Sequence, residues 1–480
     1  MYSQPMKSVF ISGNFSVLHP GHIRLFHLAK GLGEKLVIGI NSDESIISSM
    51  KVPLNLRIES LKSIEMVDEV IVINSNLKET LNKLKPDFVL KGKEHEHSHN
   101  LEEEILNGYG GKLVFGSGDF AMSSEDYLLG YFSKSAINNR EIVTSFFKRH
   151  NIKKERIISL LTSIKSLKLL VVGDLIIDEY IDCESIGLSQ EDPAVVFRPI
   201  SEKKFVGGAG IVALHSASIG VNTSFLTYAG SDGEANFARS SFDTKNINSY
   251  LIVDGLRSTI LKKRFRAGGK TQFRLTIHED SAISNKSRST FLEKATEMMD
   301  NVDVLIFSDF NYGLLDKDTV DKLIRKAKQK DIFIAADCQI SSQIADYLKY
   351  SNVDLVTPTE HEARVTLRDN SSGLAKIAIA FQELLNVPRL FITLGHDGLL
   401  FQESSGNEKS PFITDLIPAL ANKSVDTAGA GDSMLVFASL ALAAGSTISE
   451  AGYLGSLAAG IQVSRVGNTP LTISEILEAI

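Results

Sequence analysis

GNFSVLHPGHIRLF, residues 13–26, follows the short apolar run SVFIS and leads into a helical pattern. A proline and a glycine stand where that pattern begins, as they do at the entrances of helices. Further short apolar runs then alternate with helical patterns: LVIGIN, EVIVIN, FVLKG and KLVFG. Such runs are typical of a parallel sheet that is covered on both faces. The stretch therefore predicts a doubly wound α/β domain, which we place at residues 1–132.

A second alternating series begins at LKLLVVGD, residues 167–174, and continues through VDVLIFSD, DIFIAAD, VDLVTP and RLFITLG. It predicts a second doubly wound α/β domain over residues 167–480. Between the two domains, residues 133–166 carry many charges, few glycines and an amphipathic pattern. This composition favours a helical linker over a flexible tether.

The composition excludes several classes of function. With 43% hydrophobic and 23% charged residues, the chain resembles an ordinary globular protein. A net charge of -7 argues against a general surface for nucleic acid. The longest apolar region, residues 435–461, is interrupted by Gly445, Ser446, Thr447 and Glu450, so we expect buried helices and no membrane span. Two distant cysteines and the lack of a leader pattern favour the cytoplasm.

His19 and His22 stand three residues apart where the first strand gives way to a helix. Ligands of open parallel sheets gather at the carboxyl ends of strands, and the N–H groups of a helix N-terminus attract phosphate. Because residues three apart share one face of a helical turn, both imidazoles can point at one phosphate. Two donors there would stabilise the charge that develops on an α-phosphate under attack. The alternative is a pair of loop histidines with unrelated hydrogen bonds.

HPGH resembles the HxGH signature of the cytidylyltransferase-like nucleotidyltransferases, and the resemblance extends through LVIGINSDES, MVDEVIVI and KPDFVLKGKE. It implies that His19 and His22 are catalytic and that a serine-rich stretch closes over the phosphates. The residues that it assigns to nucleotide binding are Gly13, Asn14, Phe15, Arg57, Lys91, Gly92, Ser123 and Ser124. Relatives usually carry aspartate in place of Ser16, which leaves the part played by that side chain open.

EHEHSH, residues 94–99, has the alternating carboxylates and imidazoles of a metal-binding segment. The resemblance makes this segment a loop after the strand that lines the cleft, and solvated polar loops are far commoner than metal sites. We therefore expect no metal there.

DTAGAGDSM, residues 426–434, precedes a long apolar helical pattern. Gly429, Ala430 and Gly431 offer unobstructed N–H groups at a helix N-terminus, and Asp432 projects from the first turn. Phosphoryl transfer to an alcohol needs donors for the moving phosphoryl group and a base near the hydroxyl. The alternative is a glycine-rich turn that an aspartate caps.

This segment resembles the GAGD signature of the ribokinase-like (PfkB) sugar kinases, whose domain carries a small β lid. VVGDLIIDEY, FSDFNYGLL, VTPTEHEA and ITLGHDG occur in the order of the family, and the match is closest to the kinase part of the bifunctional heptose enzymes. By this resemblance Asp432 is the catalytic base, and Glu362 helps to place Mg²⁺ through water. The resemblance assigns ATP to Thr393, Gly395, Gly398, Gly429, Ala430 and Gly431, and the sugar phosphate to Asp178, Gly207, Gly208, Lys262, Arg264, Arg274 and Asp309.

The lid segment KKRFRAGGKTQFR gathers basic residues in an otherwise acidic chain, which supports a contact with the substrate's own phosphate. A solvated hairpin is the alternative. Two departures remove polar contacts: Ile211 replaces a sugar-contacting asparagine, and Thr359 replaces an asparagine that helps to organise magnesium. They leave open a changed sugar or a weakened kinase.

A kinase and a nucleotidyltransferase on one chain suggest consecutive steps of nucleotide-sugar synthesis, with ADP-heptose as the leading product. In the bifunctional heptose enzymes the two domains follow in the opposite order. The first alternative is a cytidylyltransferase, using CTP, joined to a kinase for glycerol or ribitol phosphate. The second is an active transferase with a degenerate kinase domain that senses sugar or forms a dimer. We expect ATP and Mg²⁺ in catalysis, small-molecule substrates, and a homodimer formed through the lid.

Overall fold

The computed structural model describes residues 7–16, 18, 20–43, 52–74, 77–92, 101–116, 139–192, 194–255, 257–279, 283–339, 346–407, 410–421 and 423–480. His19, Ser123, Ser124 and the segment EHEHSH lie outside the described residues. The chain divides into two compact units, one built mainly on residues before 145 and the other mainly on residues from 145 onward. The exact domain limits given above stay a prediction.

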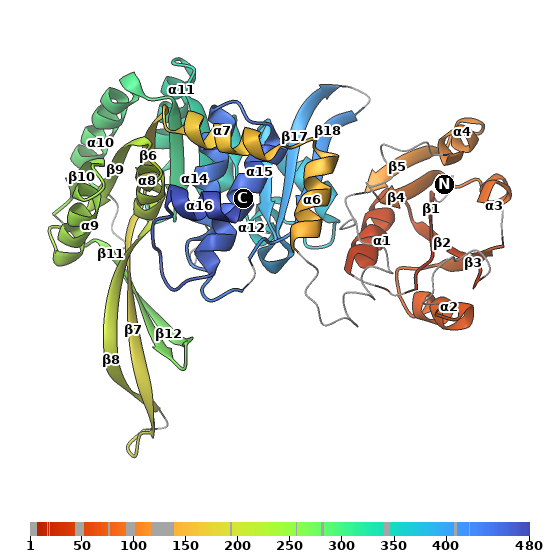
Figure 1. Cartoon of the computed structure of the whole chain (residues 1–480), viewed down its shortest axis with the longest axis horizontal. Coiled ribbons are helices and arrows are strands. Elements are labelled where there is room, and N and C mark those ends of the chain that lie inside the picture. The colour runs from red at the N-terminus through yellow and green to blue at the C-terminus, as the bar shows by residue number, and fades with distance from the viewer. Residues whose placement is uncertain are drawn as a thin grey trace. The chain divides into compact units, whose positions relative to one another are not determined.

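The first unit is built on a five-stranded parallel sheet with strand order β3-β2-β1-β4-β5 (Figure 1). Its strands are β1 (Ser8–Gly13), β2 (Lys35–Asn41), β3 (Glu69–Ile73), β4 (Phe88–Gly92) and β5 (Lys112–Gly116). Its helices are α1 (Pro20–Leu32), α2 (Leu54–Lys62), α3 (Leu77–Leu84) and α4 (Leu101–Asn107). The strand order switches between β1 and β4, because β2 and β3 lie on one side of β1 whereas β4 and β5 lie on the other. In sheets of this type ligands bind in the crevice at the carboxyl ends of the two strands at the switch point.

The apolar runs predicted as strands in this unit all form strands because both faces of the sheet are covered. One core cluster contains Val9, Ile11, Phe26 and Leu36, and a second contains Phe10, Val37 and Leu81. Along β1 and β2, neighbouring residues belong alternately to the first and the second cluster, which is the period expected when successive side chains point to opposite faces. The predicted doubly wound fold is confirmed here.

The second unit is built on a nine-stranded sheet of order β10-β9-β6-β13-β14-β15-β16-β17-β18. Its strands are β6 (Lys168–Gly173), β9 (Asn222–Ala229), β10 (Asn248–Val253), β13 (Val304–Asp309), β14 (Phe333–Cys338), β15 (Leu355–Val356), β16 (Arg389–Thr393), β17 (Leu399–Asn407) and β18 (Ser410–Ile417). The pairs from β10 to β16 are parallel, whereas β17 runs antiparallel to β16. This sheet confirms the second predicted α/β domain.

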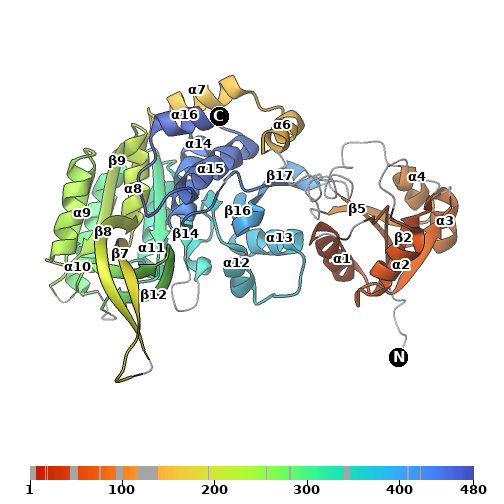
Figure 2. The ribbon, with the colours of Figure 1, turned by 60° about the horizontal axis from the view of Figure 1, so that its bottom comes forward.

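Helices lie on both faces of this sheet, with α14 and α15 on one face and α12 and α13 on the other (Figure 2). The α-helices are α6 (Asn139–Arg149), α7 (Lys154–Ile164), α8 (Ala209–Ser218), α9 (Gly233–Asp243), α10 (Asn285–Met298), α11 (Lys317–Lys328), α12 (Glu360–Leu367), α13 (Leu374–Leu385), α14 (Ala430–Ala443), α15 (Ile448–Val463) and α16 (Ile473–Ala479). Short 3-10 helices are η3 (Met299–Asn301), η4 (Tyr347–Tyr350) and η5 (Gly395–Asp397). Among the described residues, no helix has the length and apolar character needed to cross a membrane.

A separate four-stranded sheet forms the lid, in the order β12-β11-β7-β8. Its strands are β7 (Leu175–Leu188), β8 (Val195–Gly208), β11 (Ile260–Ala267) and β12 (Lys270–Ile277). The antiparallel pair β7 and β8 extends from the body of the unit as an arm (Figure 1). The β lid predicted from the family resemblance is therefore present.

Candidate active sites

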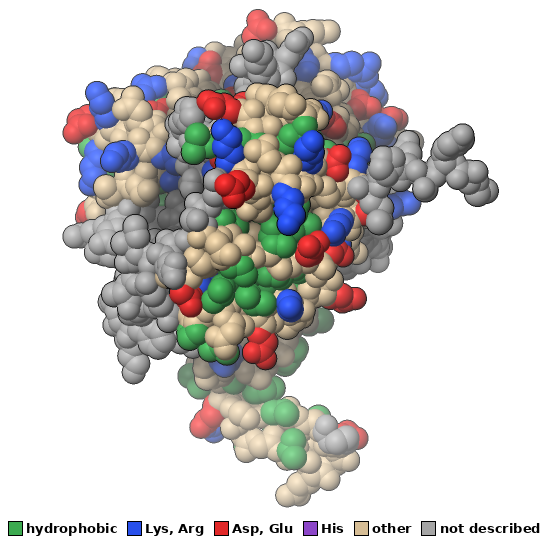
Figure 3. Space-filling view, turned by 90° about the vertical axis from the view of Figure 1, so that its right-hand side faces the viewer, with side chains coloured by type: hydrophobic (Ala, Val, Ile, Leu, Met, Phe, Trp, Pro, Cys, Tyr) green, Lys and Arg blue, Asp and Glu red, His purple; other side chains and the backbone are tan. Residues whose placement is uncertain are grey.

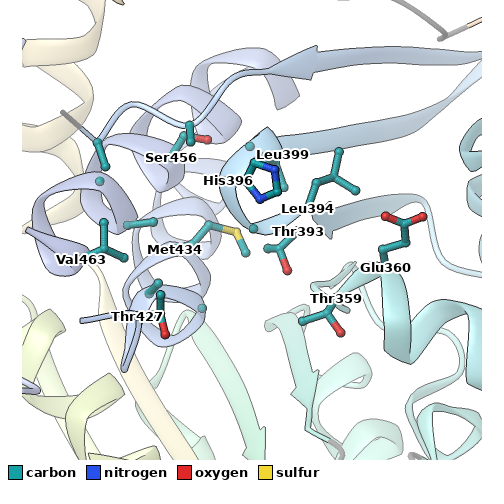
Figure 4. A pocket seen from close by; sticks show the side chains of 18 of the residues that line it. Thr359, Glu360, Thr393, Leu394, His396, Leu399, Thr427, Met434, Ser456 and Val463 are labelled. Carbon is teal, nitrogen blue, oxygen red and sulfur yellow. The ribbon is translucent and has the colours of Figure 1, made fainter. Parts of the chain in front are cut away.

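A cavity of about 1100 Å³ opens beside the N-terminus of α14. Met434 and Val463 face it from one side, and Thr393 and Leu394 face it from the other (Figure 4). Of the residues that the sequence assigned to ATP or magnesium, the cavity is lined by Thr393, Gly395, Gly398, Ala430, Gly431 and Glu362. A volume of this size, with apolar walls and a few polar groups, suits a nucleotide.

The N-terminus of α14 presents a glycine and a buried carboxylate. Gly429 caps the helix with φ of 76°, a left-handed backbone that glycine adopts without a steric cost. Asp432, in the first turn, is 4% exposed, and its Oδ1 has no hydrogen-bond partner among the described residues. Burial, and then the nearby charge of Asp178, raise the pKa of Asp432 to about 7. A carboxyl group with this pKa can accept a proton near neutral pH.

Asp178 lies on β7 and is held by the protein at both carboxylate oxygens. Its Oδ1 accepts hydrogen bonds from Arg264 Nε at 3.3 Å and Arg264 Nη2 at 3.2 Å. Its Oδ2 accepts from Asn468 Nδ2 at 3.1 Å. Gly207 passes so close that a Cβ there would lie 2.4 Å from Asp178 Oδ2. Burial raises the pKa of Asp178, while the charges of Arg264 and Lys262 oppose the shift.

Two further basic residues of the predicted set come from the lid. Lys262 pairs with Asp178 in the register of β11 and β7, and its ammonium lies 5.1 Å from the ring centre of Phe310. Burial lowers the pKa of Lys262, against the opposing charge of Asp178. Arg274 lies on β12 directly across from Arg264. The structure therefore brings Asp178, Lys262 and Arg264 together, with Arg274 on the neighbouring strand.

Gly208 and Asp309, which the sequence also assigned to the sugar phosphate, both have a structural role within the protein. Gly208 caps α8 with φ of 56°. The Asp309 carboxylate lies 2.5 Å from Lys349 Nζ, accepts from Tyr350 Oη at 2.7 Å and is 1% exposed. In this structure Asp309 braces the end of β13, and its contact with substrate stays a prediction.

Carboxylates gather at one end of the cavity. Asp337 and Glu362 both line it, and burial raises the pKa of Asp337 well above its usual range, helped by the charges of Glu362 and Asp432. Carboxylates that raise one another's pKa are suited to a divalent cation. No three metal-ligating side chains within the described ranges converge on one point. The donor set thus fits Mg²⁺ held mainly by nucleotide phosphates and water, with these carboxylates around it.

Thr359, at one of the two departures, caps a helix. Thr359 N donates to Glu362 Oε2 at 2.8 Å, and Glu362 N donates to Thr359 Oγ1 at 3.2 Å. These reciprocal bonds are a capping box for α12, and they orient the carboxylate predicted to act near magnesium. Ile211, at the other departure, is fully buried in α8 and adds no polar atom to the site.

A candidate nucleotide site lies at the carboxyl end of β1 in the first unit. Arg57 is buried, with its guanidinium donating from Nη1 to Asn14 O at 2.7 Å and to Asn41 O at 3.0 Å. Its Nη2 lies 2.5 Å from Asp43 Oδ1, and Nε donates to Val52 O at 2.9 Å. Arg57 therefore ties the ends of β1 and β2 together, and its contact with a triphosphate stays a prediction.

The remaining described residues of the predicted nucleotide set surround the same strand ends. The His22 ring packs beside the rings of Phe15 and Phe26, with distances of 5.0 Å and 6.4 Å between ring centres. Lys91, beside Gly92 at the end of β4, forms an ion pair of 2.8 Å with the buried Glu102 of α4. Ser16 is buried, and its Oγ finds no partner within the described part of the chain.

Sequence reasoning missed two residues of the candidate site in the second unit. Asp337 is the last residue of the predicted strand DIFIAAD. Its position could have identified it, because ligands bind at the carboxyl ends of parallel strands. Asn468 gave no such signal, because nothing in its neighbourhood relates it to Asp178, which lies 290 residues earlier in the chain.

Two family models match the chain. The pfkB family carbohydrate kinase model matches residues 166–474. The cytidylyltransferase-like model matches residues 10–109. Both matches fall on the regions whose motifs predicted these families.

The curated relatives include the protein named "Bifunctional protein HldE" from Syntrophotalea carbinolica, which is 29% identical over 325 residues. The protein of the same name from Helicobacter pylori strain J99 is 29% identical over 313 residues. The matched regions span 67% and 64% of this chain, and 64% and 65% of the two relatives. Alignments of this length must include much of the second unit, since residues 1–166 are too few to supply them.

Solved structures share the fold of the second unit. Ribokinase from Arabidopsis thaliana, complexed with ribose and ATP, matches 65% of this chain and 98% of its own, with TM-score 0.52 and 16% identity. Phosphofructokinase-2 from Escherichia coli gives the same coverage, with TM-score 0.55 and 18% identity. These likenesses establish a ribokinase-like fold.

Proposed function

The chain belongs to the pfkB family of carbohydrate kinases and carries a cytidylyltransferase-like domain before its kinase domain, and from this premise we propose that it performs two consecutive steps of nucleotide-sugar synthesis. In the first step, the kinase domain transfers the γ-phosphoryl group of ATP to a hydroxyl of a sugar phosphate. In the second step, the other domain transfers the nucleoside monophosphate part of a nucleoside triphosphate to a sugar 1-phosphate and releases pyrophosphate.

The observation that carries the kinase proposal is the buried Asp432 carboxylate beside an ATP-sized cavity. Its pKa of about 7 allows Asp432 to take the proton of the sugar hydroxyl as the hydroxyl attacks phosphorus. The N–H groups of the α14 entrance, from Gly429 to Gly431, would stabilise the charge on the moving phosphoryl group. Below pH 7 the base becomes protonated, so kcat is expected to fall there.

The sugar would be held from the lid side. Asp178 accepts sugar hydroxyls with the lone pairs that Arg264 and Asn468 leave available. Lys262 and Arg274 supply positive charge for the phosphate already on the sugar. Mg²⁺ bound with ATP would neutralise phosphate charge near Asp337 and Glu362, the residues present to hold it through water.

The transferase step would use the entrance of α1. His19 and His22 are proposed to stabilise the α-phosphate under attack by the sugar 1-phosphate, which displaces pyrophosphate without a covalent enzyme intermediate. Lys91, oriented by Glu102, adds a positive charge at the neighbouring strand end. Arg57 keeps the loop around Asn14 in place for this reaction.

We propose heptose 7-phosphate, phosphorylated at its anomeric oxygen, as the kinase substrate and ADP-heptose as the final product, with a separate phosphatase hydrolysing the 7-phosphate between the two steps. The support is the name shared by the curated relatives together with the order of the kinase motifs. ATP is then the nucleotide of both steps. We expect the protein to act in the cytoplasm, which its two distant cysteines favour.

We also propose a homodimer formed through the lid. Apolar side chains stand exposed on the lid strands, and hydrophobic atoms appear on the surface of the arm at the bottom of Figure 3. These residues are Ile186, Leu188, Val195, Ile200, Phe273, Leu275 and Ile277. Two copies that paired along these strands would cover apolar surface that a single chain leaves in water.

The division into two sites predicts opposite effects of two substitutions in the full chain. His19→Ala should abolish pyrophosphate release from ATP and sugar 1-phosphate while leaving sugar-dependent ADP formation intact. Asp432→Asn should lower sugar-dependent ADP formation at least 100-fold while sparing pyrophosphate release, because the amide cannot accept the proton. Both activities are measured on each variant with coupled assays.

Equal loss of both activities in either variant would contradict the two-site division. The substrates are identified by screening heptose, hexose and polyol phosphates against ATP and CTP. Turnover of glycerol or ribitol phosphate with CTP would favour the polyol alternative. A kinase domain that binds sugar in calorimetric titration but never MgATP would favour the sensor alternative.

A further inference from the structure

Asn468 connects two parts of the kinase site that come from distant segments. It lies between α15 and α16 and is 6% exposed. Its Nδ2 donates to Asp178 Oδ2 at 3.1 Å. On the other side, a Cβ added to Gly429 would lie 2.4 Å from Asn468 Oδ1. The side chain therefore fills the space between the sugar-site carboxylate and the cap of α14.

Asn468 completes the restraint on Asp178. Arg264, from β11, holds Oδ1 of this carboxylate, and Asn468 holds Oδ2. A carboxylate that is held at both oxygens by groups from different elements keeps one orientation, which fixes the directions of its remaining lone pairs. Arg264 alone could restrain only one of the two oxygens.

The segment around Asn468 is in turn bonded to the residues before α14. Gly467 N donates to Asp426 Oδ2 at 3.0 Å. Gln462 Nε2 donates to Gly467 O at 3.0 Å and to Ala428 O at 3.2 Å. Because these bonds join one short loop to residues 426–428, Asn468 keeps its place relative to Gly429.

We propose that Asn468 is a positioning residue of the kinase, which sets the sugar-binding carboxylate of Asp178 in register with the phosphate-binding entrance of α14. The inference deepens the proposed kinase function and rests on it. Asn468 Oδ1 is buried, finds no hydrogen-bond partner among the described residues and packs against Gly429. Asn468 Nδ2 is the atom that orients Asp178. Asn468 itself does not take part in proton or phosphoryl transfer.

The test compares Asn468→Leu and Asn468→Ala in the full chain, with the sugar phosphate that the unchanged chain turns over fastest. Leucine keeps the branched shape of asparagine but cannot donate to Asp178. Losing a hydrogen bond to a charged group should raise the KM for the sugar about 10- to 100-fold in both variants. The KM for ATP should change by about twofold at most, because the substitution weakens contacts with the sugar and leaves those with ATP in place.

Gln382→Ala is the matched control, since Gln382 is another buried amide, whose Nε2 donates to Pro388 O at 2.7 Å away from the site. It should lower thermal stability without raising the KM for the sugar. The inference is overturned if Asn468→Leu has the KM of the unchanged chain, or if both Asn468 variants raise the KM for ATP as much as that for the sugar. An unchanged chain that phosphorylates none of the sugars tested overturns the proposed kinase function, and the inference with it.

Discussion

Single buried groups set the pH behaviour of the second unit. His215, in α8, is fully buried, and its Nδ1 accepts from Leu471 N at 3.1 Å. Burial, and then the charge of Arg465, lower the pKa of His215 to about 3 from an ordinary value of 6.5. Between these two pH values, the unfolded chain binds a proton that the folded chain does not. The free energy of unfolding therefore decreases as the pH falls below 6.5.

This linkage predicts a measurable effect of His215→Gln, which keeps an acceptor for Leu471 N but has no proton to gain. From pH 7.5 to pH 5.5, His215 should cost the unchanged chain about 1.4 kcal/mol of stability that the variant does not lose. Asp432 and Asp174 each have a pKa raised to about 7, so their protonation increases the free energy of unfolding as the pH falls. Both groups are present in the unchanged chain and in the variant, so their contributions cancel in the comparison. Urea unfolding of the second unit at the two pH values measures the difference.

His396→Gln is the control for that measurement, because the His396 side chain is 95% exposed. Its variation of unfolding free energy with pH should equal that of the unchanged chain. If the unfolding free energy of His215→Gln varied with pH as that of the unchanged chain does, His215 would take up a proton as readily in the folded state as in the unfolded state.

At the scale of residues, motifs predicted the carboxylates but not their partners. Asp178 and Asp432 stand in recognisable sequence contexts, and both are buried beside the cavity or the lid. Arg57 was predicted from the same kind of evidence, yet its donors are engaged by backbone carbonyls of β1 and β2. Which oxygens satisfy a buried guanidinium depends on how strand ends approach one another, and a linear pattern does not carry that information.

Among the elements, the helical linker predicted from residues 133–166 shows what an amphipathic pattern can and cannot tell. The helices α6 and α7 lie within this segment, while its role as a linker stays a prediction. The pattern did not indicate which surface their apolar faces would cover. In the structure α7 packs on α14, and Phe146 of α6 lies 6.2 Å from Phe401 between ring centres. We propose that these helices fold as part of the kinase unit.

The packing of α7 predicts unequal effects of two neighbouring substitutions. Leu160 is fully buried, so Leu160→Ala should lower the free energy of unfolding of the second unit by about 2 to 5 kcal/mol. Ile158, on the same helix, is 45% exposed, and Ile158→Ala should cost less than about 1 kcal/mol. Denaturant unfolding and the half-life of kinase activity at elevated temperature measure both. Equal effects would mean that α7 does not cover α14 in solution.

Among the described residues, the two most exposed large apolar side chains of the molecule stand on the lid. Leu188 is 74% exposed and Ile200 is 68% exposed, on strands that extend beyond the body of the unit. The sequence predicted a lid dimer only through the family resemblance. The alternation of apolar and polar residues along β7 and β8 indicates strands, but it cannot indicate whether a second chain covers them.

A lid dimer predicts that charges on the arm separate the two chains. Leu188→Glu combined with Ile200→Glu should convert a particle of about twice 52.5 kDa into one of 52.5 kDa, as measured by light scattering after size-exclusion chromatography. Leu477→Glu, at another exposed leucine of α16, should leave the mass unchanged. An unchanged chain that elutes as a single copy at micromolar concentration would exclude the dimer.

The contrast between α14 and the lid bears on how this enzyme can change during evolution. Every residue of α14 from Asp432 to Leu442 is buried, so mutations along this helix disturb the core and are removed by selection for stability. The lid strand β12 is exposed along its whole length in a single chain, so substitutions there disturb no core and act instead on the proposed substrate and dimer contacts. Lineages that inherit this chain should therefore acquire new sugars through their lids, while Asp432, the proposed base, stays where it is.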